Sequence, residues 1–182
     1  MTLPYPDDAP LTDGVVVLRR WAADDLACVE AASRDPSIPE TTTVPAAYTE
    51  REGRAWIERQ LGRLALGEGL SLAIADAADG RARGYVGLLM REHAAGTAGI
   101  GYWLVPDARG GGRATRAVGL LARWGRDDAG LARVEAHVEP ANEASQRVLE
   151  RVGFRREALL RSDLAFPTRR ADALVFALLP ES

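Results

Sequence analysis

Three consecutive glycines between two arginines form the segment of the sequence best suited to binding an anion. Glycines let the backbone approach a ligand closely, because no Cβ stands in the way. A helical apolar pattern follows, so the free N–H groups of the helix's first turn would point into the same space, with the positive end of the helix dipole behind them. This arrangement suits a pyrophosphate. The segment comprises Arg109, Gly110, Gly111, Gly112, Arg113, Ala114 and Thr115.

Other phosphate-binding motifs fit this segment less well. A Walker loop needs a lysine, and all 23 basic residues of the chain are arginines. The dinucleotide fingerprint GxGxxG is also absent. The competing interpretation is a mobile glycine loop that binds nothing, flanked by two solvated arginines.

The elements that would position this loop alternate between strand and helix patterns, which is typical of an α/β fold. Apolar and β-branched runs predict strands at about residues 15–18, 70–75, 84–91, 98–105, 133–138, 154–164 and 171–179. Helical spacing predicts helices at about residues 24–34, 49–67, 114–129 and 145–152. The loop of residues 35–48, rich in Pro and Thr, could be an element on the substrate side.

The length and composition fit one globular domain, residues 1–182, with a core at about 14–179 and an N-terminal arm of residues 1–13. The net charge is −3 and the arginines are dispersed, so neither nucleic acid nor a membrane surface is an expected partner. The single cysteine, Cys28, excludes an internal disulfide, and we expect it to be buried and inert. The chain shows no secretory signal and no membrane-spanning run, so we expect a cytoplasmic protein.

Two further segments make the glycine loop more specific. The pattern Arg109-x-x-Gly112-x-Ala114 resembles the coenzyme A pyrophosphate loop of the GNAT N-acetyltransferase superfamily. Residues 142–154 resemble the second signature of that family's RimJ/RimL-like branch, and residues 101–106 are also similar to that branch. The likeness covers nearly the whole chain. It implies an α/β (α+β) GNAT fold, with a mixed, mostly antiparallel sheet of about seven strands splayed at the cofactor cleft and flanked by about four helices.

The resemblance also implies a cofactor site. Acetyl-CoA would be the co-substrate, and no metal would take part. Leu104 and Val105 would offer backbone groups to the pantetheine arm, which would lie where their strand splays from the next one. Asn142 would reach the pantetheine amide from the other side, and it can cap a helix at the same time. Arg147 is a further candidate for cofactor binding.

Acetyl transfer to an amine requires one group to take a proton from the amine and another to protonate the leaving thiolate. By the resemblance, Ser145 lies near the sulfur and could donate that proton, although it could instead be a helix cap. Many members of the branch carry a glutamate where this chain has Gly99, and Asp163 is a candidate to replace it as the base. An ordered water chain is an alternative, and each candidate side chain could instead be a solvated polar residue. The other candidates are Glu92, His93, Glu135 and His137.

The resulting hypothesis is an acetyl-CoA-dependent N-acetyltransferase that acts directly on a primary amine, either a protein N-terminal amine or a small amine. Tyr102 and Trp103 precede the loop and are expected in the core. The alternatives are a catalytically weak acyl-CoA-binding sensor or interaction module, and a general phosphate-binding domain. The oligomeric state, monomer or homodimer, is not decided by the sequence.

Overall fold

The computed structural model of the chain describes residues 3–6, 10–90 and 96–180. Its strands are β1 (Leu11–Thr12), β2 (Val16–Arg19), β3 (Gly69–Asp76), β4 (Ala82–Met90), β5 (Thr97–Leu104), β6 (Arg133–Val138), β7 (Arg155–Ala165) and β8 (Arg170–Leu178). Its α-helices are α1 (Leu26–Ser33), α2 (Ser37–Thr41), α3 (Glu50–Gly62), α4 (Arg113–Asp127) and α5 (Glu143–Val152). Short 3₁₀ turns, at Ala23–Asp25 and Pro106–Ala108, precede α1 and the glycine loop.

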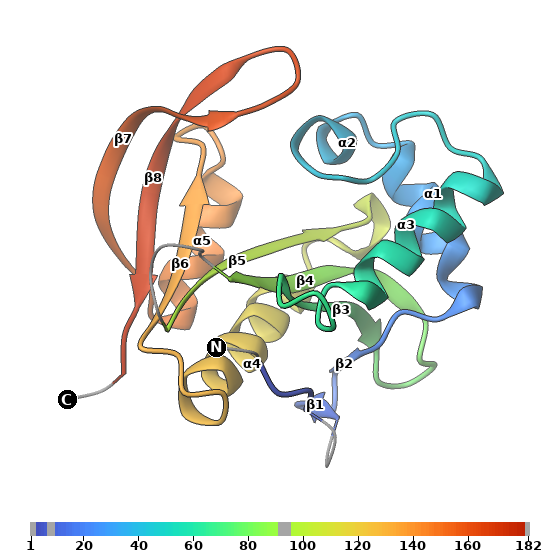
Figure 1. The fold of residues 1–182 in the computed structure, drawn as a ribbon, viewed down its shortest axis with the longest axis horizontal. Helices are drawn as coiled ribbons and strands as arrows, with labels where there is room; N and C mark the ends of the chain where they lie inside the picture. The colour runs from blue at the N-terminus through green and yellow to red at the C-terminus, as the bar shows by residue number, and fades with distance from the viewer. Residues whose placement is uncertain (1–2, 7–9, 91–95, 181–182) are drawn as a thin grey trace.

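All eight strands of the described residues form one sheet, in the order β1-β2-β3-β4-β5-β6-β8-β7. Every neighbouring pair is antiparallel except β5 and β6, which are parallel and are joined through α4 (Figure 1). On β5, Tyr102 contacts α5 whereas the next residue, Trp103, packs against Trp56 of α3. Because successive strand residues point to opposite faces, α5 and α3 cover opposite faces of the sheet. The predicted fold class is confirmed.

Three elements differ from the sequence prediction. β1 pairs with β2, so part of the expected N-terminal arm extends the sheet. α2 lies within the expected loop of residues 35–48. Both elements are too short to show a hydrophobic period. α3 begins after its predicted cap, Thr49, but it ends at Gly62, and residues 63–67 form turns instead of the predicted last helical turn.

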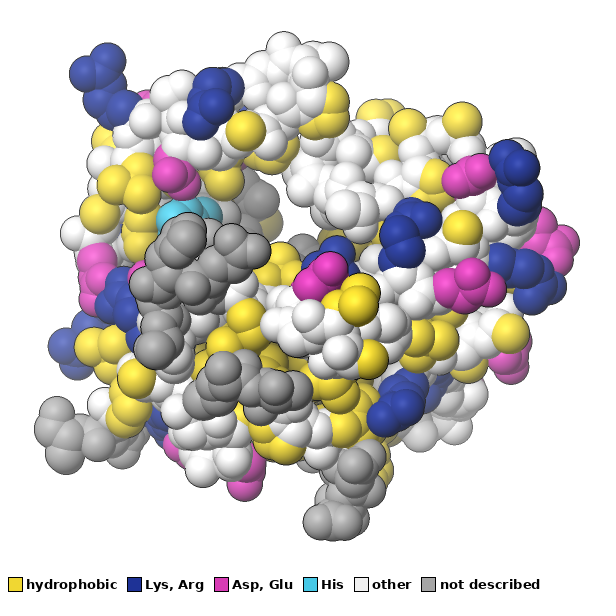
Figure 2. Space-filling view, in the orientation of Figure 1, with side chains coloured by type: hydrophobic (Ala, Val, Ile, Leu, Met, Phe, Trp, Pro, Cys, Tyr) yellow, Lys and Arg dark blue, Asp and Glu magenta, His cyan; other side chains and the backbone are white. Residues whose placement is uncertain are grey.

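The sheet opens between β5 and β6. Their pairing ends at Gly99 and Glu135, although β5 stays paired with β4 as far as Leu104. β6 is held in the same way by β8 up to Val138. The two halves of the sheet therefore diverge beyond Gly99, and the space-filling view shows a hollow between the half with β6 to β8 and the half with α1 to α3 (Figures 1 and 2). This is the splay that the resemblance implied.

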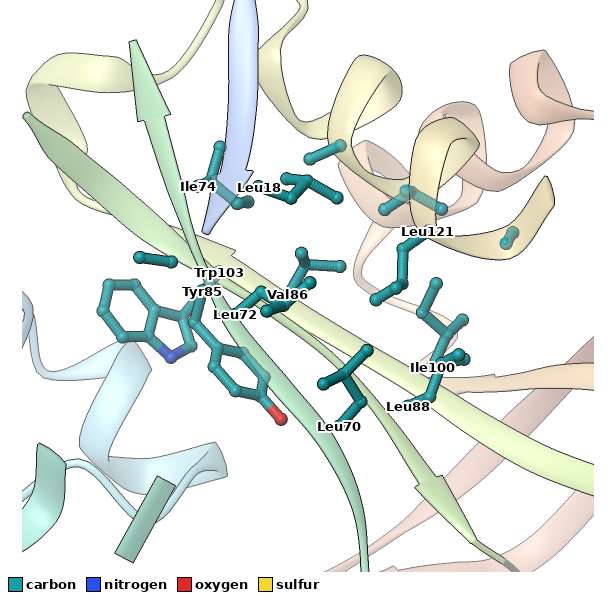
Figure 3. Close-up of a cluster of buried hydrophobic side chains, with 14 of the residues drawn as sticks. Leu18, Leu70, Leu72, Ile74, Tyr85, Val86, Leu88, Ile100, Trp103 and Leu121 are labelled. Carbon is teal, nitrogen blue, oxygen red and sulfur yellow. The ribbon is translucent and has the colours of Figure 1, made fainter. Parts of the chain in front are cut away.

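The core packs on the half of the sheet formed by β2 to β5. β3 is buried along seven of its eight residues, because helices cover both of its faces. Side chains from these strands and from α4 meet in one apolar cluster (Figure 3), which includes Leu18, Leu70, Leu72, Ile74, Val86, Leu88 and Leu121. On the α3 face, Trp56, Tyr85 and Trp103 pack together, with ring centroids 6.0 to 6.4 Å apart. This aromatic group lies beside the open end of the sheet.

Candidate active site

The glycine loop presents unpaired backbone N–H groups at the start of α4. Gly110 and Gly112 have φ values of +83° and +74°, a left-handed conformation that glycine adopts without strain. Gly112 is the N-cap of α4, and no side chain caps this helix. Among the described residues, the N–H groups of residues 110–112 have no hydrogen-bond partner, and those of the first turn of α4 have none within the helix. The loop therefore has the donors that an anion cradle needs.

The two arginines of the loop are already paired with carboxylates. Arg109 Nη2 lies 2.6 Å from Asp35 Oδ2, and its Nε donates to the Leu104 carbonyl at 3.1 Å. Arg113 Nε donates to Asp76 Oδ1 at 2.6 Å, and this bond lowers the pKa of the Asp76 carboxyl. Both side chains fasten the loop to other parts of the chain. Most of the attraction for an anion must then come from the backbone and the helix dipole.

Leu104 and Val105 were expected to pair with pantetheine. Only Leu104 turns its backbone toward the gap that opens between β5 and β6. The Val105 N–H donates to the Arg83 carbonyl at 2.9 Å, and its carbonyl accepts from the Ala108 N–H at 3.0 Å. Backbone groups alternate sides along a strand, so the groups of Leu104 face away from β4. Val105 therefore has no N–H to offer a ligand.

A hydroxyl pair joins the two sides of the gap near the start of α5. Asn142 Oδ1 accepts from the Ser145 N–H at 3.1 Å, which confirms its predicted role as a helix cap. The Tyr102 hydroxyl lies 2.5 Å from Ser145 Oγ. The Tyr102 ring packs against the core but is half-buried instead of lying within it, and no sequence pattern indicated its contact with Ser145. Burial raises the pKa of Tyr102 to about 12, so the phenol is a proton donor at neutral pH.

Three of the candidates for the general base come together on the other side of the gap. His137 Nδ1 lies 2.8 Å from Asp163 Oδ2, and its Nε2 lies 3.6 Å from Glu135 Oε2. Glu135 is the residue of β6 in register with Gly99, so it stands beside the position where the expected carboxylate is missing. The other two candidates, Glu92 and His93, lie outside the described residues.

A cavity of about 360 Å³ connects the hydroxyl pair with His137. Its walls come from β4, β5, β6, β7, α3, the start of α5 and the segment after α2. They include Tyr102, Ser145, Asn142, His137, Glu139 and Trp56. Arg147 does not line this cavity; it forms an exposed ion pair with Glu143 one turn earlier in α5. The cavity thus has a hydroxyl proton donor on one side and an imidazole on the other.

This geometry is that of a known family. The profile described as "Acetyltransferase (GNAT) domain" matches residues 16–155. The chain belongs to the GNAT acetyltransferase family. A relative from Bacillus subtilis, named probable N-acetyltransferase YjcK, is 35% identical over 133 residues, which cover 72% of this chain and 74% of the relative.

Solved structures place this GNAT acetyltransferase near the RimJ/RimL branch. Mycobacterium smegmatis RimJ, in complex with CoA-disulfide, has a TM-score of 0.80 and 29% identity, covering 95% of this chain and 87% of its own. RimL, named as a ribosomal L7/L12 α-N-protein acetyltransferase in complex with coenzyme A, has a TM-score of 0.80 at 17% identity. The match covers 93% of this chain and 96% of the RimL chain. The latter likeness concerns the fold alone.

Two further findings concern metal ions and membrane spans. Within residues 3–6, 10–90 and 96–180, no group of three His, Cys, Asp or Glu side chains is placed to hold a metal ion. In the same ranges, no helix has both the length and the apolar character needed to cross a membrane.

Proposed function

We propose that this acetyltransferase uses acetyl-CoA and transfers the acetyl group directly to a primary amine. The observation that carries the proposal is the cavity at the open sheet, with the Ser145–Tyr102 pair on one side and the His137–Asp163 pair on the other. The uncapped start of α4 fits the pyrophosphate of coenzyme A. The coenzyme A bound to RimJ, at 29% identity, supports the same donor here.

In this proposal His137 is the general base. Asp163 accepts a hydrogen bond from Nδ1–H, and this leaves Nε2 unprotonated and able to accept the proton of the attacking amine. The imidazolium that forms is stabilised by Asp163 and by Glu135, 3.6 Å from Nε2. A carboxylate that orients the imidazole of a general base is a recurring arrangement in enzymes.

On the other side, Ser145 protonates the leaving group. As the C–S bond of the thioester breaks, the Ser145 hydroxyl gives its proton to the sulfur and receives one from the Tyr102 phenol, which solvent later restores. No covalent enzyme intermediate forms in this sequence. The two proton transfers take place on opposite sides of the reacting carbonyl, so neither pair has to move between them.

Two classes of acceptor amine fit this proposal. Protein N-terminal amines are the first class, and small amines are the second. The test is calorimetric binding of acetyl-CoA, followed in the same sample by thiol release against N-terminal peptides, polyamines and aminoglycosides. Thiol release with one class would establish the enzyme and identify its acceptor. Tight binding without release from any amine would favour an acyl-CoA sensor, and no binding would overturn the proposal.

Replacing Ser145 with Ala is expected to lower kcat by about 10²-fold, and Tyr102→Phe by about tenfold, because each removes one step of the proton relay. The dissociation constant of acetyl-CoA should stay within about twofold of wild type, since neither hydroxyl contributes to the anion cradle. The double variant should be no slower than Ser145→Ala alone, because Tyr102 acts through Ser145.

Tyr48→Phe provides the matched control for these variants, because Tyr48 is also half-buried but does not line the cavity. Single-turnover acetyl transfer would measure the effects. Additive losses in the double variant would show that the two hydroxyls act separately, and an unchanged kcat in Ser145→Ala would reduce that hydroxyl to a structural role.

A further inference from the structure

Beyond the hydroxyl pair, the cavity is also lined by residues of α3 and β4. This end is lined by Trp56, Gln60, Arg63, Tyr85 and Leu89. None of these residues is used in acetyl transfer as described above. We propose that this end of the cavity binds a carboxylate carried by the acceptor amine. The inference rests on the proposed function, since it identifies what accompanies the amine.

Arg63 is the side chain that would bind the carboxylate. It is the C-cap residue that directly follows α3, and it lines the cavity. In the described part of the chain it has no carboxylate partner, whereas Arg109 and Arg113 each pair with one and Arg169 pairs with two. Its Nε donates to Gln60 Oε1 at 3.0 Å, which fixes the plane of the guanidinium and leaves both Nη groups for another acceptor. A planar pair of N–H donors matches the two oxygens of a carboxylate.

Gln60 adds a second donor at the same place. The residue is 3% exposed, and its Oε1 accepts from both Arg63 Nε and Ser71 Oγ. Its Nε2 has no hydrogen-bond partner within the described residues. A buried donor left without an acceptor is unfavourable, so a ligand oxygen nearby would satisfy a group that the protein leaves unpaired.

The surroundings strengthen this interaction and give the substrate a direction. Trp56, Tyr85 and Trp103 form an apolar wall, and the low dielectric of such a wall increases the attraction between a guanidinium and a carboxylate. On the β6 side, the cavity is lined by His137, whose imidazole can accept a hydrogen bond from the amine end, and by Glu139, whose carboxylate is paired with Arg169. An acceptor of about amino-acid size, with an amine at one end and a carboxylate at the other, matches this distribution of charge.

The test uses the tryptophans of the wall as a probe. Quenching of intrinsic fluorescence would be measured with N-acetyl-alanine, a product that keeps the carboxylate, and with N-acetyl-alaninamide, which lacks it. Wild type should bind the acid at least about tenfold more tightly than the amide, as expected for a charge-assisted pair of hydrogen bonds. Arg63→Met should abolish this preference, and Arg63→Lys should retain part of it, because an ammonium keeps the charge without the planar fork.

Arg59→Met is the matched control, since Arg59 lies in the last turn of α3, four residues before Arg63, but is exposed and does not line the cavity. A carboxylate preference that survives in Arg63→Met, or equal binding of acid and amide by wild type, would overturn the proposal. These readouts need no catalysis, so they are independent of whether acetyl transfer is observed.

The source of the carboxylate is distinguished with two acceptors in the thiol-release assay. One is free alanine. The other is an alanyl-aspartyl dipeptide amide, in which the carboxylate belongs to the side chain of the second residue, aspartate. An Arg63-dependent KM for alanine would indicate a free amino acid, and one for the dipeptide would indicate a peptide N-terminus with an acidic neighbour. Release with both acceptors and no dependence on Arg63 would contradict the carboxylate site and leave acetyl transfer intact.

Discussion

Replacing His137 with Gln is expected to lower kcat by about 10²- to 10⁴-fold at neutral pH, the range that a lost general base usually accounts for. The imidazole lines the cavity and is oriented by Asp163 through a 2.8 Å contact. Glutamine is similar in reach but cannot accept a proton from an amine. Acetyl-CoA binding should be unchanged, because His137 lies on β6 and not on the glycine loop, so the loss should fall on the chemical step.

Asp163→Asn is the companion variant for His137→Gln. It keeps the shape of the contact but can stabilise the wrong tautomer of the imidazole, so kcat should fall, though less than in His137→Gln. Glu135→Gln distinguishes the remaining candidate, and it should have the smallest effect if Glu135 only supports the imidazolium. The measurement is kcat by thiol release together with the acetyl-CoA dissociation constant. A normal kcat in His137→Gln would assign proton removal to solvent or to Glu135.

Gly112→Val is expected to raise the dissociation constant of acetyl-CoA by about tenfold or more. Gly112 has a φ of +74°, which a β-branched residue tolerates poorly, and a shift in this residue displaces the N–H groups at the start of α4. A Cβ at this position would meet no protein atom within 4 Å. The effect therefore comes from the backbone geometry and from the space that a ligand would occupy, not from a clash within the protein.

Gly130→Val is the control for this substitution. Gly130 has a φ of +69° and equally open surroundings, but it follows α4 at the end far from the loop. Both variants should lose about 1 to 2 kcal/mol of folding stability from the left-handed conformation, which thermal unfolding would measure. Only Gly112→Val should weaken acetyl-CoA binding in calorimetry. Equal affinity in both variants would mean that the pyrophosphate binds elsewhere.

The sequence by itself determined those features that local patterns encode. The strand-loop-helix unit around Gly112 could be predicted because helical spacing and glycine content are properties of neighbouring residues. The Asn142 cap could be predicted for the same reason, and so could the buried state of Cys28, whose pKa burial raises to about 12. The elements that escaped prediction, β1 and α2, are too short to show a period.

Only the tertiary structure decided which side chains meet. Tyr102 and Ser145 are 43 residues apart in the chain, and Arg109 pairs with Asp35 across 74 residues. His137 and Asp163 meet although β8 lies between β6 and β7, and Asp163 falls where the pairing of β7 with β8 shifts register, between Leu160 and Leu164. Strand order and register depend on the packing of the whole sheet, which no local pattern encodes. The sequence therefore supplied a set of candidate bases, and the fold brought three of them together.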